Sequence, residues 1–277
     1  MRFRFLSCLW LAIFLSGLLL SCSETGKLYR SKNIEDREKA ARLLFEKKDY
    51  EKAVFVFEEL LSIYKGTGKA EDVLYYYAWC KYYLKDYLTA AFYFNDFANQ
   101  FPNSKKAEQS QYMYGFCFYK DSDPWYLDQT STKKAIENLQ FYLKANPGSS
   151  RVDSCNLLMS ELREKLAKKS FEQASLYLKI GYHKSAIESF RHMLEEYPDS
   201  RQKEEASFKQ FIASVLYAEE SVFEKQKKRY LEAISYYRKF VDKYPSSSFI
   251  QEAEEYYVKV NKAITRLEAS NGITKSE

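Results

Sequence analysis

Cysteine and histidine have the widest chemical range of the side chains in this 277-residue sequence, and their spacing limits what they can do. Cys80, Cys117 and Cys155 are separated by more than 30 residues each and lie in apolar stretches, so they form no C-x-x-C pair. We expect them to be buried small hydrophobic side chains, with a disulfide as the less favoured alternative. His183 and His192 have no cluster of acidic or cysteine residues around them, so no metal site is predicted.

Sequence motifs for nucleotide binding or nucleophilic catalysis are absent. The eight glycines form no phosphate-binding loop, and no serine, threonine or cysteine lies in a nucleophile elbow. Acidic residues are scattered over segments that alternate with lysine, which is typical of solvated helix faces. We therefore expect neither an enzyme nor a bound cofactor.

The N-terminal segment is the one part of the sequence with a defined covalent chemistry. Residues 1–21 have two early arginines followed by an almost wholly apolar run, which is typical of a secretory signal peptide. The run ends in L-L-S-C, which resembles the lipobox of bacterial lipoproteins and implies acylation of Cys22. The alternative is an ordinary signal peptide that contains a cysteine. The residue after Cys22 is Ser23 rather than aspartate, which favours the outer membrane over the inner membrane.

A frame of three residues recurs along the chain and predicts its architecture. In Ala186, Phe190 and Pro198, a small residue is followed four positions later by a large apolar one and then, eight positions on, by proline. The first two share a helical face, and the proline ends the helix. The full frames begin at Ala90, Ala135, Ala186 and Ala233, and a degenerate copy begins at Ala53.

Helices are expected throughout the folded part, because no stretch has the alternating pattern of a strand. The frame resembles the tetratricopeptide repeat, so the predicted fold class is all-α, a superhelical solenoid of about five tetratricopeptide-like helix pairs plus a C-terminal capping helix. The expected pairs are 34–47 with 50–64, 70–84 with 87–100, 105–120 with 132–144, 150–180 with 184–196 and 202–221 with 229–243, and the cap is 248–268. Candidate N-caps are Asp49, Ser104, Ser131 and Ser248.

The expected domain organisation follows from these elements. A lipidated tether, 22–33, is followed by an N-terminal half, 34–147, and a C-terminal half with the capping helix, 148–268. A flexible tail, 269–277, ends the chain.

Two segments leave alternatives open. The block 121–131 lengthens the third pair, and its Trp125 and Tyr126 either plug the edge of the solenoid or bind a partner. The basic run 225–229 is more often a hydrated turn between helices than a contact for phosphate headgroups or an acidic partner. The whole chain has a net charge of +5, and loss of the two signal-peptide arginines lowers it to +3. Nucleic acid is not an expected partner, because of the compartment that the signal implies.

Tyrosine is unusually frequent, with 25 residues in a chain that is 17% aromatic. Tyrosines at 75–77 and 82–83 would surround one helix, so some of them must face outward. Exposed tyrosines offer large, rigid contacts, although they can also fill gaps between repeats. We expect Tyr77 in the core, and Tyr76 and Tyr83 at the surface.

Local motifs, in their order along the chain, resemble the BamD-type lipoprotein family of the β-barrel assembly machinery. They are Y-M-Y-G at 112–115, D-Q at 128–129, L-R-E-K-L-A at 162–167, Gly181 and Y-P-D at 197–199. The resemblance covers about 33–264. It implies a non-catalytic, lipid-anchored scaffold on the periplasmic side of the outer membrane, which takes part in the insertion of outer-membrane proteins.

The same resemblance implies partners for each half of the chain. The N-terminal half would bind C-terminal signals of unfolded outer-membrane protein precursors, with Tyr76, Tyr83 and Tyr112 as candidate contacts. The C-terminal half would dock the periplasmic domain of the β-barrel insertase, with candidates Arg163, His183 and Arg191. Other assembly-complex lipoproteins, and outer-membrane lipid through acylated Cys22, are further expected partners.

The sequence departs from the family at one docking position. An arginine that is common in the fourth pair's second helix is replaced by Ser189, and Arg191 lies about 200° around the helix from it. No salt bridge is therefore transferred from the family. The alternative function is a different periplasmic tetratricopeptide lipoprotein, which scaffolds cell-wall synthesis or secretion.

Overall fold

The computed structural model describes residues 25–273, with side chains up to 269. All regular secondary structure in this part of the chain is helical. None of the described helices has both the length and the apolar composition that crossing a membrane would require. The expected signal peptide and the lipidation site Cys22 lie outside the described residues.

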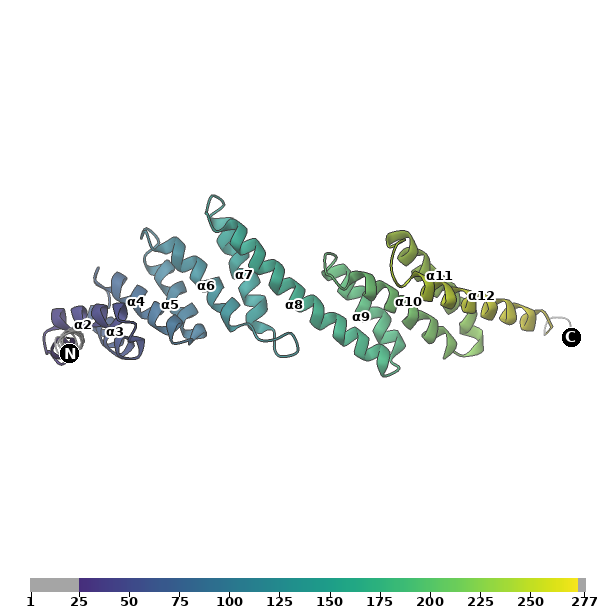
Figure 1. Ribbon diagram of the computed structural model, residues 1–277, viewed down its shortest axis with the longest axis horizontal. Helices are drawn as coiled ribbons and strands as arrows, with labels where there is room; N and C mark the ends of the chain where they lie inside the picture. The colour runs from purple at the N-terminus through teal and green to yellow at the C-terminus, as the bar shows by residue number, and fades with distance from the viewer. Residues whose placement is uncertain (1–24, 274–277) are drawn as a thin grey trace, which may run out of the picture. The chain divides into compact units, whose positions relative to one another are not determined.

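The chain divides into two compact units, and the division falls within helix α8 (Figure 1). Within the described residues, unit 1 comprises 25–122 and 130–156, and unit 2 comprises 123–129 and 157–273. Unit 1 contains three pairs: α2 (Ile34–Glu46) with α3 (Tyr50–Tyr64), α4 (Ala70–Tyr83) with α5 (Tyr87–Gln100), and α6 (Ala107–Asp121) with α7 (Thr130–Ala145). Most of α8 (Val152–Lys179), with α9 (His183–Glu196), α10 (Lys203–Glu219), α11 (Phe223–Lys243) and α12 (Ile250–Ile273), builds unit 2.

The recurring frame forms the contacts between paired helices, as the sequence predicts. Its five alanines are fully buried: Ala53, Ala90, Ala135, Ala186 and Ala233. The large apolar residues four positions later are buried in four copies: Phe57, Phe94, Leu139 and Phe190. Small residues on the preceding helices, such as Ala41, Ala78 and Ala174, are also fully buried. The predicted all-α fold of five helix pairs and a capping helix is confirmed.

Of the four predicted N-caps, only Asp49 is confirmed, since its side chain accepts the Lys52 N–H at 3.3 Å. The prediction for Ser104 is wrong because α6 begins later, with Lys106 as its N-cap. Ser131 is wrong because it lies inside α7, where its hydroxyl donates to Asp121 at 2.6 Å. Ser248 is also wrong, since the serine that accepts an N–H before α12 is Ser247.

A Pro-x-Ser sequence closes each full frame and explains these displaced serines. In each copy the serine hydroxyl accepts the N–H two residues ahead and donates to a glutamate in the preceding first helix of a pair. The serine–glutamate pairs are Ser104–Glu71, Ser149–Glu108, Ser200–Glu164 and Ser247–Glu204. One side chain therefore orders the turn and ties it to the preceding repeat.

The ends of several elements differ from expectation. Part of the predicted tether is helical, at 25–29, because Tyr29 packs against the core of unit 1 and Thr25 is buried. The basic run 225–229 lies inside α11, so its interpretation as a turn is wrong. Lysine, glutamine and arginine are good helix formers, and Glu224 stabilises the first turn of that helix. Helix α12 continues to Ile273, past the expected end at 268.

The close approach of α6 and α7 depends on Gly115. A Cβ added there would lie 3.0 Å from Leu139 Cδ2 and 3.2 Å from the Leu139 backbone nitrogen. We expect Gly115→Ala to lower the free energy of unfolding by about 1–2 kcal/mol, because strain from overpacking exceeds the gain in helix propensity. Urea unfolding measures this. Gly68→Ala is the matched control, since a Cβ there meets nothing within 4 Å; a Gly115→Ala protein as stable as this control would contradict the prediction.

Candidate peptide-binding surface and docking pocket

Unit 1 carries a continuous set of partly exposed aromatic side chains on α2, α4 and α6 and at the start of α3, here called the aromatic surface. The Phe45 and Tyr76 rings meet edge-on at 5.0 Å, and Tyr83 stacks on Tyr50 at 4.4 Å and on Trp79 at 5.5 Å. Helix α6 extends the set, because Phe116 lies 6.3 Å from Tyr82 and stacks on Tyr112 at 5.4 Å. The aromatic surface comprises Phe45, Tyr50, Tyr75, Tyr76, Trp79, Tyr82, Tyr83, Tyr112 and Phe116.

The three candidate tyrosines all belong to this surface but differ in exposure. Tyr83 is the most open, at 45% exposed. Tyr76 is half-buried because its ring stacks on Phe57 of α3 at 5.9 Å. Tyr77, predicted to lie in the core, is buried.

Tyr112 is half-buried at the other end of the surface. Arg151 lies over its ring at 5.2 Å, and Tyr142 meets it edge-on at 5.7 Å. Burial raises the pKa of the Tyr112 hydroxyl, so this phenol stays neutral at physiological pH. Tyr112 can therefore offer a peptide an aromatic face and a neutral hydroxyl.

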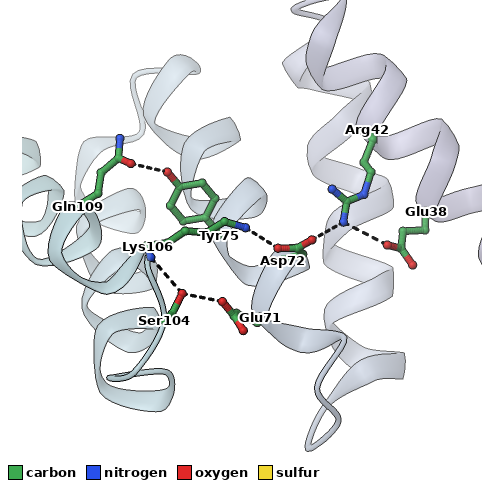
Figure 2. Close-up of polar contacts among 8 residues, drawn as sticks. All are labelled: Glu38, Arg42, Glu71, Asp72, Tyr75, Ser104, Lys106 and Gln109. Carbon is green, nitrogen blue, oxygen red and sulfur yellow. Dashed lines mark hydrogen bonds and ion pairs between the residues drawn. The ribbon is translucent and has the colours of Figure 1, made fainter.

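A chain of charged groups joins the first helices of all three pairs of unit 1 (Figure 2). The Asp72 carboxylate on α4 accepts from Arg42 of α2 at 2.7 Å and from Lys106 at the start of α6. Figure 2 also shows the second carboxylate on Arg42, that of Glu38 at 3.3 Å. Both cations lie over the Tyr76 ring, Arg42 at 5.2 Å and Lys106 at 5.6 Å.

Asp72 stays ionised in this arrangement. Partial burial opposes its ionisation, but the hydrogen bonds and charges of Lys106 and Arg42 outweigh burial and lower the pKa of the carboxyl. Asp72 therefore holds two cations in place with one negative charge. An incoming carboxylate could bind either cation in competition with Asp72.

Unit 2 contains a pocket of about 500 Å³ between α9, α10 and α11. Four cations and two carboxylates line it: Lys184, Lys225, Lys228 and Arg229, with Glu188 and Glu232. The guanidinium of Arg229 lies 3.9 Å from the Tyr217 ring centroid and donates to the Ser221 hydroxyl. This arginine is therefore held in place by an aromatic ring and a hydroxyl, which leaves most of its donors for a ligand.

Comparison with known families identifies this architecture. The family model described as "YfiO: Outer membrane lipoprotein" matches residues 38–227, which is well over half of the chain. The chain belongs to the YfiO outer membrane lipoprotein family. The predicted BamD-type family is thereby confirmed, and a tetratricopeptide repeat model matches 221–247.

Other comparisons are more distant. A tetratricopeptide-repeat protein from Bacteroides fragilis NCTC 9343 is 15% identical with a TM-score of 0.41, over 87% of this chain and 100% of that one. The TPR2AB domain of yeast Sti1 in complex with pHSP90 is 16% identical with a TM-score of 0.39, over 82% of this chain and 98% of that one. No curated protein matches the sequence.

The three docking candidates of this YfiO-family chain lie around α9 but do not form one cluster. Arg163 donates to the Glu196 carbonyl at 3.1 Å, at the end of α9. His183 begins that helix, roughly 20 Å away by helix rise. Arg191, between them, is paired with Glu188 and Glu195 at 2.8 and 2.9 Å.

Burial sets His183 apart from the two arginines. Its side chain is only 8% exposed, and Nδ1 lies 2.8 Å from Glu220 just past the end of α10. That leaves it little surface for a partner and gives it a role in joining α9 to α10. Arg163 remains exposed, and the Arg191 side chain is 40% exposed.

The three cysteines within the described residues, Cys80, Cys117 and Cys155, are buried and unpaired, as the sequence favours. Burial raises the pKa of the Cys80 thiol to about 12, so it is not a nucleophile at neutral pH. Within the described residues no group of histidine, cysteine or acidic side chains could hold a metal ion. The YfiO family and the tetratricopeptide repeat are scaffold types.

Sequence reasoning missed the cations of both candidate sites. Arg42 and Lys106 reach Asp72 from other repeats, and the spacing of 34 between Asp72 and Lys106 equals the usual length of a tetratricopeptide repeat. That spacing was the available signal. Arg229 was visible only as the end of a basic run, and helix α11 gives it its direction toward Tyr217.

Proposed function

We propose that this lipoprotein is a non-catalytic scaffold of outer-membrane β-barrel assembly, anchored on the periplasmic side of the membrane through acylated Cys22. Unit 1 receives the C-terminal signal of unfolded precursors. Unit 2 docks the periplasmic domain of the insertase, alongside other lipoproteins of the assembly complex.

The observation that carries this proposal is the pair of cations over Tyr76. A precursor that ends in an aromatic residue presents one ring and one carboxylate close together. Tyr83 and Tyr76 provide stacking partners, and Arg42 and Lys106 lie 5.2 and 5.6 Å from the Tyr76 ring centroid. Tyr112 continues the aromatic surface for residues further from the peptide's end.

The pocket of unit 2 supplies a docking site where the family arginine is missing. Ser189 is half-buried on α9, and Arg191 is already paired with two glutamates. Arg229 is the candidate that replaces the family arginine. Tyr217 and Ser221 hold its guanidinium in place, and no carboxylate among the described residues pairs with it. An acidic group of the insertase fits there.

The test is a pull-down from solubilised membranes in mild detergent, with an affinity tag at the C-terminus. We expect an integral outer-membrane β-barrel protein with repeated periplasmic domains, in near-equal amount. Recovery of cell-wall enzymes or secretion components without that barrel would overturn the proposal and favour the alternative periplasmic scaffold.

Arg229→Gln is expected to lower recovery of the insertase about tenfold, because it removes the positioned charge from a partly buried pocket. Quantitative mass spectrometry of the same pull-down measures the loss. Arg238→Gln is the matched control, since this exposed arginine lies on the same helix outside the pocket. Equal recovery of the insertase with both variants would show that Arg229 does not take part in docking.

A further inference from the structure

The folded part of the chain begins very close to the predicted lipid anchor. Only two residues separate Cys22 from the helical segment 25–29. That segment is fixed to unit 1, because Thr25 is 8% exposed and its hydroxyl accepts a hydrogen bond from Lys47 at 2.7 Å. Three residue steps reach at most about 11 Å. The turn between α2 and α3, which contains Lys47, is therefore held near the acyl chains.

The turns inside the helix pairs of unit 1 lie on one edge, because successive pairs repeat the same antiparallel arrangement. Two of these turns contain a lysine in the left-handed conformation, Lys48 with φ 61° and Lys85 with φ 64°. Each lies five residues before the frame alanine. The same position in unit 2 is Gly181, with φ 82°.

The left-handed backbone conformation is unfavourable for lysine, whereas glycine adopts it without cost. In unit 1 the chain nevertheless places an exposed cation at this position twice. Backbone strain of this kind points to a role for the side chain. Its location beside the anchored end indicates what that role is.

Few carboxylates offset the lysines of the turns after α2 and α4. Asp49 accepts from the Lys52 N–H and pairs with the Lys52 ammonium at 2.6 Å. Asp86 accepts from the Thr89 N–H and lies 3.7 Å from Lys81. Asp121 accepts from Ser131. Among the described residues of the turns after α2 and α4, Glu46 is the remaining exposed acid, whereas the turn after α6 also exposes Asp123 and Asp128.

We propose that this lysine edge binds the anionic headgroups of phospholipids next to the anchor. The lysine edge comprises Lys27, Lys47, Lys48 and Lys85, all exposed. The proposal rests on the acylation of Cys22, which brings the edge to the bilayer. Lysines within a few ångströms of an anionic surface are attracted to it, and an acyl anchor combined with a basic patch holds a protein in a defined orientation.

Binding to vesicles tests the edge without the anchor. The mature chain with Cys22→Ser carries no acyl group, and its cosedimentation is compared on vesicles of phosphatidylcholine with and without phosphatidylglycerol. We expect binding only to the anionic vesicles, with loss in high salt. Equal binding to both kinds of vesicle, or none to either, would overturn the proposal.

The double variant Lys48→Gly with Lys85→Gly isolates the edge from folding. Glycine suits both turns, so the unfolding temperature is expected to stay equal or rise. Affinity for anionic vesicles is expected to fall roughly 25-fold, about fivefold for each lysine. The control is Lys65→Gln with Lys105→Gln, which removes two exposed lysines from the turns between pairs, at the opposite edge.

The two double variants decide the proposal. The control is expected to change affinity by less than about twofold. An equal loss in both variants would show attraction by net charge alone and overturn the lysine edge. The vesicle assay contains neither insertase nor precursor, so failure of the proposed assembly function in the pull-down would leave its result unchanged.

Discussion

Phe190→Ala is expected to lower the free energy of unfolding by about 3–5 kcal/mol. Phe190 is fully buried in the core of unit 2, where its ring lies 6.0 Å from Phe171. The fully buried Ala174, Ala186 and Met193 belong to the same core. Since these neighbours are apolar, truncation leaves an unfilled cavity rather than a hydrated one.

Phe141→Ala is the matched control for this substitution, because Phe141 lies on α7 with 66% of its surface exposed. We expect its effect to be within about 0.5 kcal/mol. Urea unfolding gives both values, and amide hydrogen exchange should locate the loss of protection by Phe190→Ala in α8–α10. Similar losses from the two variants would contradict the buried contact between α8 and α9.

The second large effect is expected on precursor recognition. Replacing both Arg42 and Tyr76 with alanine should weaken binding of a peptide with a C-terminal aromatic residue by about 30- to 100-fold, as expected for a hot spot of two or more kcal/mol. Arg42 would lose its pairing with the peptide carboxylate, and Tyr76 its ring contact. Fluorescence anisotropy of a labelled peptide measures the change, and circular dichroism checks the fold.

Amidation of the peptide's C-terminus separates the two contributions. If Arg42 binds the carboxylate, Arg42→Ala and amidation each weaken binding, and their combination is no worse than either alone. Tyr126→Ala is the control for loss of a tyrosine, since Tyr126 is 63% exposed in unit 2. Additive effects of Arg42→Ala and amidation would place the carboxylate elsewhere.

The block 121–131 contains two adjacent aromatic residues with different environments. Its Asp and Pro predict the end of a helix and a loop, and α6 does end at Asp121. Trp125 is half-buried under Lys168 at 5.1 Å, whereas Tyr126 is exposed. The sequence pattern treats the two aromatic residues alike, and only packing distinguishes them.

The sequence by itself determined the helix pairs. Because Ala186 and Phe190 lie one helical turn apart and Pro198 ends the helix, the frame specifies helices, their buried faces and their ends from local geometry alone. The order of short motifs likewise determined the family, which the match over 38–227 confirms. Each of these features depends on residues close together in the chain.

Only the tertiary structure decided which distant side chains meet. The contact of Asp72 with Arg42 and Lys106, the ring of Tyr217 under Arg229, and the hydrogen bond that fixes Thr25 to Lys47 each join different elements. The direction of a side chain from one helix toward another depends on how the helices stack, and no local pattern encodes that geometry. For this reason the sequence predicted Tyr76, Tyr83 and Tyr112 as candidate contacts, and the structure supplied the cations beside Tyr76.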